Sequence, residues 1–287
     1  MEKFEFPLLI VHWVNALLGP LVTAIHSAIG ITLTPDHEGN VIWPYMVMVL
    51  LIVLLFTVLG LLIRSRLSVE NPSKWQIVLE DIVGGLAGML TEWIGPKGPS
   101  FLPLIGGLGA FILVGNYMGL IPGFMSPTAN INVTVGCALT TWTFYHLQGV
   151  RAQGLVKYLL HFMFPPGVPK ALAPIMLPIE LISHSSRVMS LSLRLYGNIF
   201  GEELVIAILA FLSPWWLPLF PLPMMMLGLI TGGLQAFIFV LLSIIYLQGA
   251  THVEHEHDHG GPNHGSEHGT PGHEHGDARD MAEMAAI

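Results

Sequence analysis

The chain has 287 residues, of which 53% are hydrophobic and only 10% are charged, and its mean hydropathy is +0.66. Soluble domains carry about 25% charged residues, so this composition excludes a soluble globular domain and indicates a polytopic membrane protein. A single cysteine, Cys137, lies in an apolar segment, which excludes both a disulfide framework and a thiolate metal site within the chain.

The apolar stretch at the start of the chain, residues 6–32, is interrupted by two histidines, an asparagine and a proline. We interpret residues 1–42 as an N-terminal segment that lies in the membrane interface, and a spanning helix is the alternative. A cleavable signal peptide is not expected, because acidic residues flank Lys3 and the apolar stretch is too long.

Three segments contain no Asp, Glu, Lys or Arg: residues 43–63, 101–121 and 131–150. Each has a length near the ~20 residues that a helix needs to cross hydrocarbon. We predict one transmembrane helix in each. Between the first two, residues 72–94 mix acids and a lysine with aliphatic side chains, a pattern typical of an amphipathic helix in the interface.

Basic residues set the expected orientation of the spans. They follow the first span, at Arg64, Arg66 and Lys74, and the third span, at Arg151, Lys157 and Lys170, whereas the loop after the second span has none. Because short cytoplasmic loops are enriched in Lys and Arg, both basic loops should be cytoplasmic. The N-terminus is then outside, and the C-terminal tail is cytoplasmic.

Two long helices complete the predicted membrane domain, residues 43–250. Residues 179–213 are a run of 35 residues without proline, and its helix would measure about 52 Å against about 30 Å of hydrocarbon. Such a helix must tilt steeply. Four prolines between 214 and 223 break the chain, and residues 224–248 form the last helix. We therefore predict an all-α polytopic membrane protein with five transmembrane helices plus interfacial amphipathic helices, ending in a tilted hairpin over 172–250.

Arg194 lies in the middle of an apolar run, residues 189–200, inside the tilted helix. A guanidinium stays charged at any reachable pH, and a charge at mid-bilayer costs roughly 2.5–3.5 kcal/mol on insertion scales. Ionisable residues at membrane depth mark ion paths by default, so we infer that Arg194 belongs to an ion pathway. A purely structural ion pair is the alternative, although no acid shares its helical turn.

One edge of the tilted helix is hydrophilic and should line a cavity or a partner subunit. At 100° per residue, six polar or small positions fall within about 40° of Arg194: Glu180, Ser183, Arg187, Ser190, Asn198 and Gly201. Glu203 lies roughly 180° from Arg194 and should face a different compartment. That separation is what two aqueous half-paths on opposite sides of a barrier would need.

The last helix has a matching face, formed by Gly228, Thr231, Gln235 and Tyr246. Gly232 and Gly233 beside this face permit close approach of another helix.

Several of these polar residues also have a structural interpretation. Arg187 can snorkel to the interface, Asn198 can form an interhelical hydrogen bond, and Ser190 can bond its own helix. Glu202 suits a solvated position or a pore mouth. His184 is expected to be a packing residue whose hydrogen bonds are satisfied.

The acidic charge of the chain belongs to its tail. Residues 251–287 hold eight acids and one base, which supplies −7 of the formal net charge of −8, and eight of the fourteen histidines. Histidines alternating with acids can bind Zn²⁺, Ni²⁺ or Cu²⁺, with His255, His257 and His259 as weak candidate ligands. The glycine and proline content instead favours a disordered, solvating extension without a fixed metal site.

Four motifs carry a resemblance to a known family: PIELISHSSRVMSLSLRLYGNIFGEELV at 178–205, LQAFIFVLLSIIYL at 234–247, NYMGLIPG at 116–123 and SPTANINVT at 126–134. Together they closely resemble subunit a of F-type rotary ATP synthases, the stator channel beside the ring of c subunits. The resemblance extends over most of residues 40–250.

The resemblance implies that this chain conducts protons through two offset half-channels to and from the c-ring carboxylates, coupling ion flow to rotary ATP synthesis. Arg194 would be the essential charge that separates the half-channels. Gln235 would be the glutamine packed near it, and Glu203 and Asn198 would belong to the half-channels. The other polar residues of the two long helices are further candidates for the proton path: Glu202, Thr231, Glu180, Ser190, Arg187 and Tyr246.

The same resemblance implies the partners and the setting. The tilted hairpin would lie against the c-ring, b-type peripheral stalk subunits would be further partners, and the setting would be the lipid of a bacterial inner membrane. It implies no cofactor and no nucleic acid. Nucleotide chemistry would belong to other subunits, since the chain has no GxxxxGK[ST] phosphate loop.

The sequence departs from some members of the family at two positions. Gly228 stands where some members carry His, and Gly119 stands where some carry an acid. The proton inlet would then depend on Glu203, water and hydroxyls such as Thr231.

An alternative function is a metal-ion secondary transporter with a His-rich cytoplasmic buffer tail. Against it, the first three spans contain no acid and only one histidine, His146, and no inverted repeat is evident.

Overall fold

The computed structural model describes residues 9–29, 39–121, 123–163, 173–212 and 221–251, which are helical apart from short connections. Eight α-helices and two short 3-10 helices follow one another within these ranges: α1 (Leu9–Ile29), α2 (Pro44–Arg64), α3 (Lys74–Ile94), η1 (Gly98–Phe101), α4 (Leu102–Met118), η2 (Pro127–Ala129), α5 (Ile131–Gln153), α6 (Leu155–Met163), α7 (Ala173–Leu212) and α8 (Leu222–Thr251). The predicted all-α fold is confirmed.

Local sequence explains where several helices begin and end. Ser73 caps α3 by accepting a hydrogen bond from the Gln76 amide, and Asn130 caps α5 in the same way from the Asn132 amide. Gly95 and Gly154 end these two helices with φ of 94° and 83°, values that favour glycine.

Five described helices are long and apolar enough to cross a membrane, as predicted in number: α1, α2, α4 with η1, α7 and α8. The set differs from the prediction in one member, since α1 takes the place of α5. Although α5 has 23 residues, its asparagine, threonine, histidine and glutamine side chains make it less apolar. By length and composition α1 can cross a membrane, the alternative that the sequence left open.

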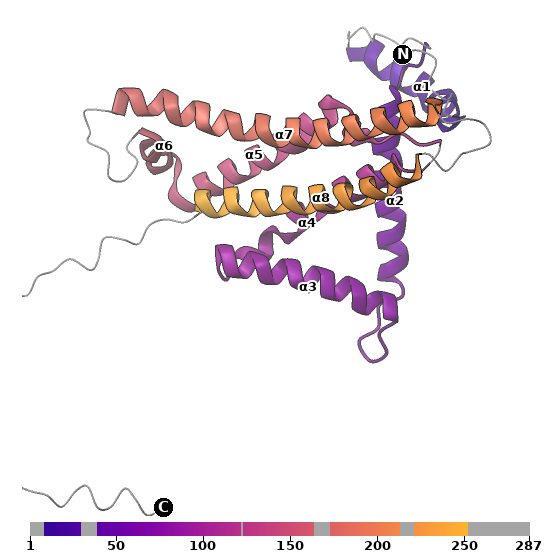
Figure 1. Ribbon diagram of the computed structural model, residues 1–287. Coiled ribbons are helices and arrows are strands. Elements are labelled where there is room, and N and C mark those ends of the chain that lie inside the picture. Colours follow the sequence, from indigo (N-terminus) through magenta and orange to yellow (C-terminus); the bar gives the residue numbers. More distant parts are fainter. Residues whose placement is uncertain (1–8, 30–38, 122, 164–172, 213–220, 252–287) are drawn as a thin grey trace, which may run out of the picture. The chain divides into compact units, whose positions relative to one another are not determined.

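The two long C-terminal helices run side by side, and α2 runs across their direction (Figure 1). With 40 and 30 residues, α7 and α8 are about 60 Å and 45 Å long. If α2 stands upright in a bilayer, α7 and α8 therefore cannot, which agrees with the steep tilt inferred from length.

Two predictions about local structure were wrong. We expected the tilted helix to begin after Pro178, but α7 begins at Ala173 and contains this proline as its sixth residue. So close to the helix start, proline removes few backbone hydrogen bonds, and the helix continues through it. The second correction is α6, nine residues with apolar side chains on one side, within a segment that we had treated only as a basic loop.

Side chains from α4, α5, α7 and α8 form the central packing cluster, which includes Ile112, Ala138, Leu195 and Phe239. Lipid tails are as apolar as leucine, so close packing rather than the hydrophobic effect holds such helices together. Accordingly, a Cβ placed on Gly109 of α4 would lie 2.5 Å from Val240 Cγ2 of α8. The predicted close approach at Gly233 is confirmed, because a Cβ there would lie 2.6 Å from the Tyr117 hydroxyl.

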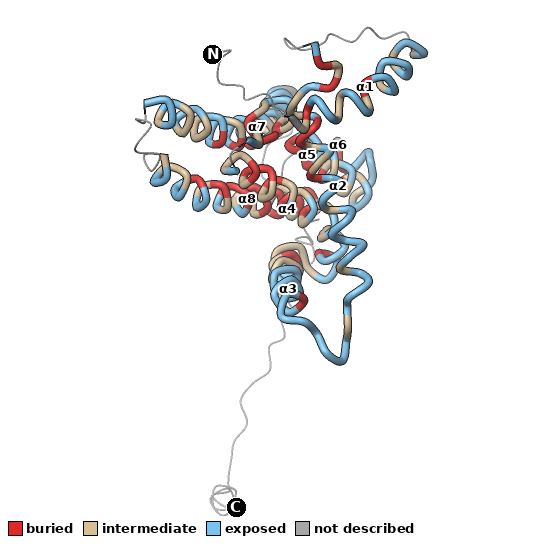
Figure 2. The backbone as a smooth tube through the Cα atoms, turned by 90° about the vertical axis from the view of Figure 1, so that its right-hand side faces the viewer, coloured by how far each residue is buried: buried red, intermediate tan, exposed pale blue. Residues whose placement is uncertain are grey.

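Much of α2 is exposed, as its pale blue colour in Figure 2 shows, and most of its residues are apolar. Leu54, Leu61 and Leu62 on this helix are 63%, 64% and 57% exposed. Such a surface suits lipid, and together with the five long apolar helices it makes the chain an integral membrane protein.

Candidate functional site

The polar edge of α7 faces the predicted polar face of α8, and we call this line of contact the polar seam. Asn198 Nδ2 donates to Gln235 Oε1 at 3.0 Å, and Thr231 Oγ1 donates to Glu202 Oε2 at 3.0 Å. Towards the other end, the Arg187 guanidinium lies 5.3 Å from the centre of the Tyr246 ring, a cation–π distance. The seam therefore joins three pairs of residues that the sequence had placed on two separate helices.

Arg194 lies on the same edge of α7 but has an exposed side chain. It makes no hydrogen bond or ion pair with any other described residue. Its neighbours Leu191 and Leu195 are buried, whereas Leu193 is exposed, so the guanidinium stands on the outward side of an apolar helix. The alternative of an internal ion pair is not what the described residues show.

Glu203 points into a different environment, inside the protein. Its Oε1 accepts a hydrogen bond of 2.9 Å from the Ser126 amide, in the connection between α4 and α5. No ion pair joins Glu203 to Arg194 within the described residues. The two charged groups thus have separate surroundings, as their angular separation on the helix predicted.

A buried polar network extends from the Glu203 contact, and we call it the Ser126 network. Ser126 Oγ donates to the Gly115 carbonyl and lies 2.7 Å from Thr128 Oγ1. Thr128 Oγ1 donates to Asn116 Oδ1 at 2.6 Å, and Asn116 Nδ2 donates to the Gly232 carbonyl at 3.0 Å. The network therefore connects η2, α4, α7 and α8 through hydrogen bonds that leave few polar atoms unsatisfied.

Two glycines leave room for the carboxyl groups of α7. A Cβ on Gly119 would lie 2.5 Å from Glu203 Oε1 and 2.8 Å from Ser126 Cβ. A Cβ on Gly228 would overlap the Glu202 carboxyl group. At both positions the absence of a side chain is therefore what allows an α7 carboxyl group to occupy that space.

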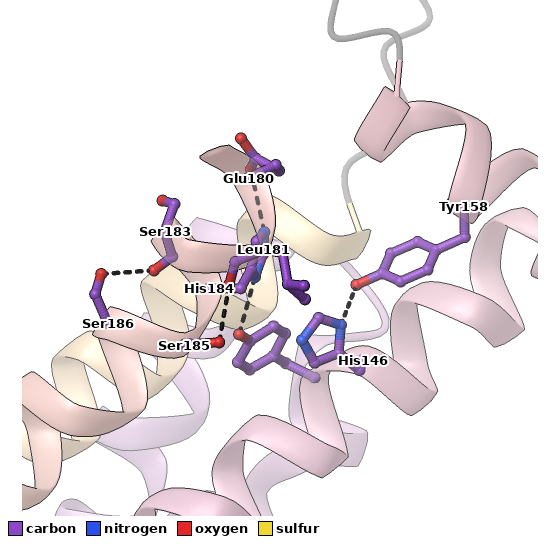
Figure 3. A network of polar contacts seen from close by, with 9 residues as sticks. His146, Tyr158, Glu180, Leu181, Ser183, His184, Ser185 and Ser186 are labelled. Atoms are coloured by element: carbon purple, nitrogen blue, oxygen red, sulfur yellow. Dashed lines mark hydrogen bonds and ion pairs between the residues drawn. The ribbon is translucent and has the colours of Figure 1, made fainter. Parts of the chain in front are cut away.

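Near the start of α7, Glu180 belongs to a second polar group of residues. Its Oε1 lies 3.2 Å from His184 Nε2, one helical turn away, and His184 Nδ1 lies 3.0 Å from the Tyr145 hydroxyl of α5 (Figure 3). On the neighbouring α6, the Tyr158 hydroxyl lies 2.7 Å from His146 Nδ1. His184 is satisfied, as the sequence predicted, but by groups that can exchange protons.

The remaining candidate residues either form no side-chain hydrogen bond with another described residue or lie outside the described residues. Ser190 is exposed on α7 and makes no side-chain hydrogen bond to another described residue. The tail histidines His255, His257 and His259 lie outside the described residues. Within the ranges that the structure describes, no group of three or more His, Cys, Asp or Glu side chains could hold a metal ion.

The Ser126 network was missed by the sequence analysis. Asn116 lies in a predicted span, and a polar residue at membrane depth is itself a signal of a functional or structural contact. Ser126 and Thr128 gave no such signal, because they lie in a loop whose fold alone brings them to Glu203.

Comparison with known proteins identifies the family. The family model described as ATP synthase A chain matches residues 45–248. A protein of Syntrophobacter fumaroxidans, "ATP synthase subunit a", is 48% identical over 206 residues, covering 71% of this chain and 83% of the relative. A protein of Geobacter sulfurreducens with the same description is 40% identical over 249 residues, covering 87% of this chain and 99% of the relative. The chain therefore belongs to the family of ATP synthase subunit a, the membrane-sector subunit of F-type ATP synthases.

Proposed function

We propose that this chain is the proton-conducting stator subunit of an F-type ATP synthase, in which two offset half-paths are separated by Arg194. The observation that carries the proposal is the position of Arg194. It is an exposed cation on α7 with no ion pair among the described residues, and it lies between two separate groups of polar residues on the same helix.

The first half-path comprises Glu203 with the Ser126 network, together with the Glu202–Thr231 contact in the polar seam. Glu203 is nine residues beyond Arg194, about 13 Å along the helix axis. The second half-path comprises the Arg187–Tyr246 contact and Glu180, which precedes Arg194 by 14 residues or about 21 Å. Both distances are too long for direct proton transfer between the two groups of residues.

The partner of Arg194 would be a carboxyl group on a ring of c subunits that turns against α7 and α8. A protonated carboxyl group can move through lipid, whereas a carboxylate in a low dielectric is strongly disfavoured. Near a guanidinium the carboxylate is stabilised, so the proton leaves there. The same fixed positive charge repels a proton that would pass directly from one half-path to the other, so leakage is suppressed while rotation continues.

The remaining parts of the proposal follow the family and the distribution of charge. Basic residues after α2 and α5 favour a cytoplasmic location for those ends, so Glu180 would serve the cytoplasmic side and Glu203 the outer side. The N-terminus is outside and the tail is cytoplasmic, in a bacterial inner membrane. The chain itself is non-catalytic, b-type stalk subunits hold it in place, and nucleotide chemistry occurs on other subunits.

The alternative of a metal-ion transporter has no supporting observation in the described part of the chain. Three spans contribute no acid, and no cluster of metal-binding side chains is present among the described residues.

The decisive variant is Arg194→Ala in the complete complex, reconstituted in vesicles. ATP-driven proton pumping should be abolished while the complex still assembles. Arg194→Lys should also fail, because an ammonium group can lose its proton in a dry site and a guanidinium cannot. Ser185→Ala, an exposed position on the same helix whose hydroxyl bonds only the Leu181 carbonyl, is the control. Pumping by Arg194→Ala at the rate of the unmodified complex would refute the proposal.

A further inference from the structure

His184 has hydrogen-bond partners on both ring nitrogens, and both partners can exchange protons. Nε2 faces the Glu180 carboxylate at 3.2 Å, and Nδ1 faces the Tyr145 hydroxyl at 3.0 Å. A packing histidine needs only one such contact to fix its ring. Two opposed contacts instead allow the ring to gain or lose a proton without turning, because tyrosine can donate to a neutral ring or accept from a charged one.

Burial differs along this short chain of groups. The His184 side chain is 13% exposed, whereas the Glu180 side chain is 37% exposed. Figure 3 shows Glu180 one helical turn from His184 at the end of α7, with His146 and Tyr158 on the neighbouring helices. A proton held on His184 is therefore one hydrogen bond away from an acid at the surface of the chain.

On the side of His184 opposite Glu180, Tyr145 lies next to the polar seam. Tyr145 lines a small crevice between α5, α7 and α8 together with Thr141, Trp142, Arg187 and Tyr246. His184 precedes Arg194 by ten residues, about 15 Å along the axis of α7. The indole N–H of Trp142, another residue of this crevice, is buried and has no hydrogen-bond partner among the described residues.

We propose that His184 is the proton-exchange residue of the cytoplasmic half-path, with Glu180 as its proton partner and Tyr145 as its positioning residue. This inference rests on the proposed function and deepens it. Glu180 and His184 together hold one proton, which is passed between the crevice and the cytoplasmic water.

The transfer is balanced within the pair. When Tyr145 accepts the Nδ1–H bond, Nε2 presents a lone pair to a protonated Glu180. The Glu180 O–H bond breaks as the Nε2–H bond forms, giving a carboxylate beside an imidazolium. The reverse transfer, followed by release of the proton from Glu180 to water, leaves a carboxylate beside a neutral imidazole. Uptake of one further proton by the pair returns both groups to their starting states. No oxidant, reductant or further reactant is needed.

Charged and titratable groups of α5, α6, α7 and α8 lie against this pair or against its direct neighbours. On α7 they are Glu180, which contacts His184, and Arg187, which lines the crevice beside Tyr145. From the other helices they are Tyr145 and His146 of α5, Tyr158 of α6 and Tyr246 of α8.

The test compares His184→Gln with His146→Gln in the complete complex in vesicles. Glutamine can keep one donor and one acceptor at position 184, but it cannot carry a proton. We expect ATP-driven pumping by His184→Gln to fall about tenfold and its dependence on cytoplasmic pH to flatten. His146→Gln is the matched control, since the His146 ring lies 5.2 Å from that of His184 but is bonded to Tyr158. We expect it to keep pumping within about twofold and to keep the pH profile of the unmodified complex.

A second variant separates proton exchange from packing. His184→Ala should lose pumping and regain it when imidazole is added to the cytoplasmic side, because a free base can replace the missing ring. Full pumping by His184→Gln, an equal loss in both glutamine variants, or a loss in His184→Ala that imidazole does not restore would each overturn the inference. Arg194→Ala in the same vesicles tests the proposed function independently. If that variant is inactive and His184→Gln is not, only the role of His184 fails.

Discussion

The two ends of α7 hold their acids in opposite ways. Glu203 is enclosed by the Ser126 network and accepts a hydrogen bond from a backbone amide. A backbone amide does not ionise, so it cannot exchange a proton with the acid. Glu180 is 37% exposed and is fixed by an imidazole, which can take and return a proton. The comparison shows that a single helix can present one acid held by a rigid framework and one acid held by a titratable side chain.

The largest expected effect is the loss of pumping on replacing Glu203, and the same replacement at Glu180 gives a direct comparison of the two acids. Glu203→Gln removes the ionisable group from an enclosed site where other groups cannot replace it, so we expect pumping to fall at least about 100-fold. Glu180→Gln removes an exposed acid whose place water can partly take, so we expect a loss of only about threefold. Pumping by the complete complex in vesicles measures both. Equal losses would show that the difference between the two ends has no functional meaning.

A smaller effect is expected where Glu202 occupies the space above Gly228. Gly228→Ala places a methyl group in the volume of the Glu202 carboxyl group, and overpacking of this kind costs about 1–3 kcal/mol. The thermal stability of the complex should fall, together with pumping. Gly136→Ala is the control, because no atom lies within 4 Å of a Cβ placed there.

The double variant Gly228→Ala with Glu202→Ala sharpens this test. It removes the carboxyl group that the methyl group displaces, so the thermal stability should return while the Glu202–Thr231 contact stays lost. A Gly228→Ala complex that is as stable as the Gly136→Ala complex would contradict the geometry.

The smallest expected effect concerns the framework around Glu203. Thr128→Val keeps the shape of the side chain but removes its hydrogen bond to Asn116 and its contact with Ser126. Leaving buried partners unsatisfied costs about 1–3 kcal/mol, so the complex should lose activity at a lower temperature. Thr140→Val on α5 is the control, since Thr140 is exposed and bonds only the Gly136 carbonyl. Identical inactivation temperatures for the two variants would show that the framework does not support Glu203.

Helical periodicity explains why much of the polar seam was predictable from the sequence. The 100° step placed Arg187 and Asn198 on one edge of α7 and placed Gln235 and Tyr246 on one face of α8, and the structure brings these two surfaces together. Such predictions depend only on the regular geometry within each helix. They succeed for long helices because that geometry does not depend on the rest of the fold.

Contacts between distant segments were not predictable in the same way. Ser126 meets Glu203 across 77 positions of sequence, through a loop whose path no periodic pattern describes. The hydrogen bond between Tyr145 and His184 likewise joins residues 39 positions apart. Pro178 inside α7 and the short helix α6 were missed for a different reason, since local rules for helix ends compete there with tertiary packing.

The space above Gly119 and Gly228 affects how this chain should be compared with its relatives. Counted column by column in an alignment, a glycine in place of an acid or a histidine is a lost functional group. In space, however, carboxyl groups from α7 fill the volumes above both glycines. A comparison of this chain with its relatives should therefore consider where each carboxyl group lies in space as well as its place in the chain.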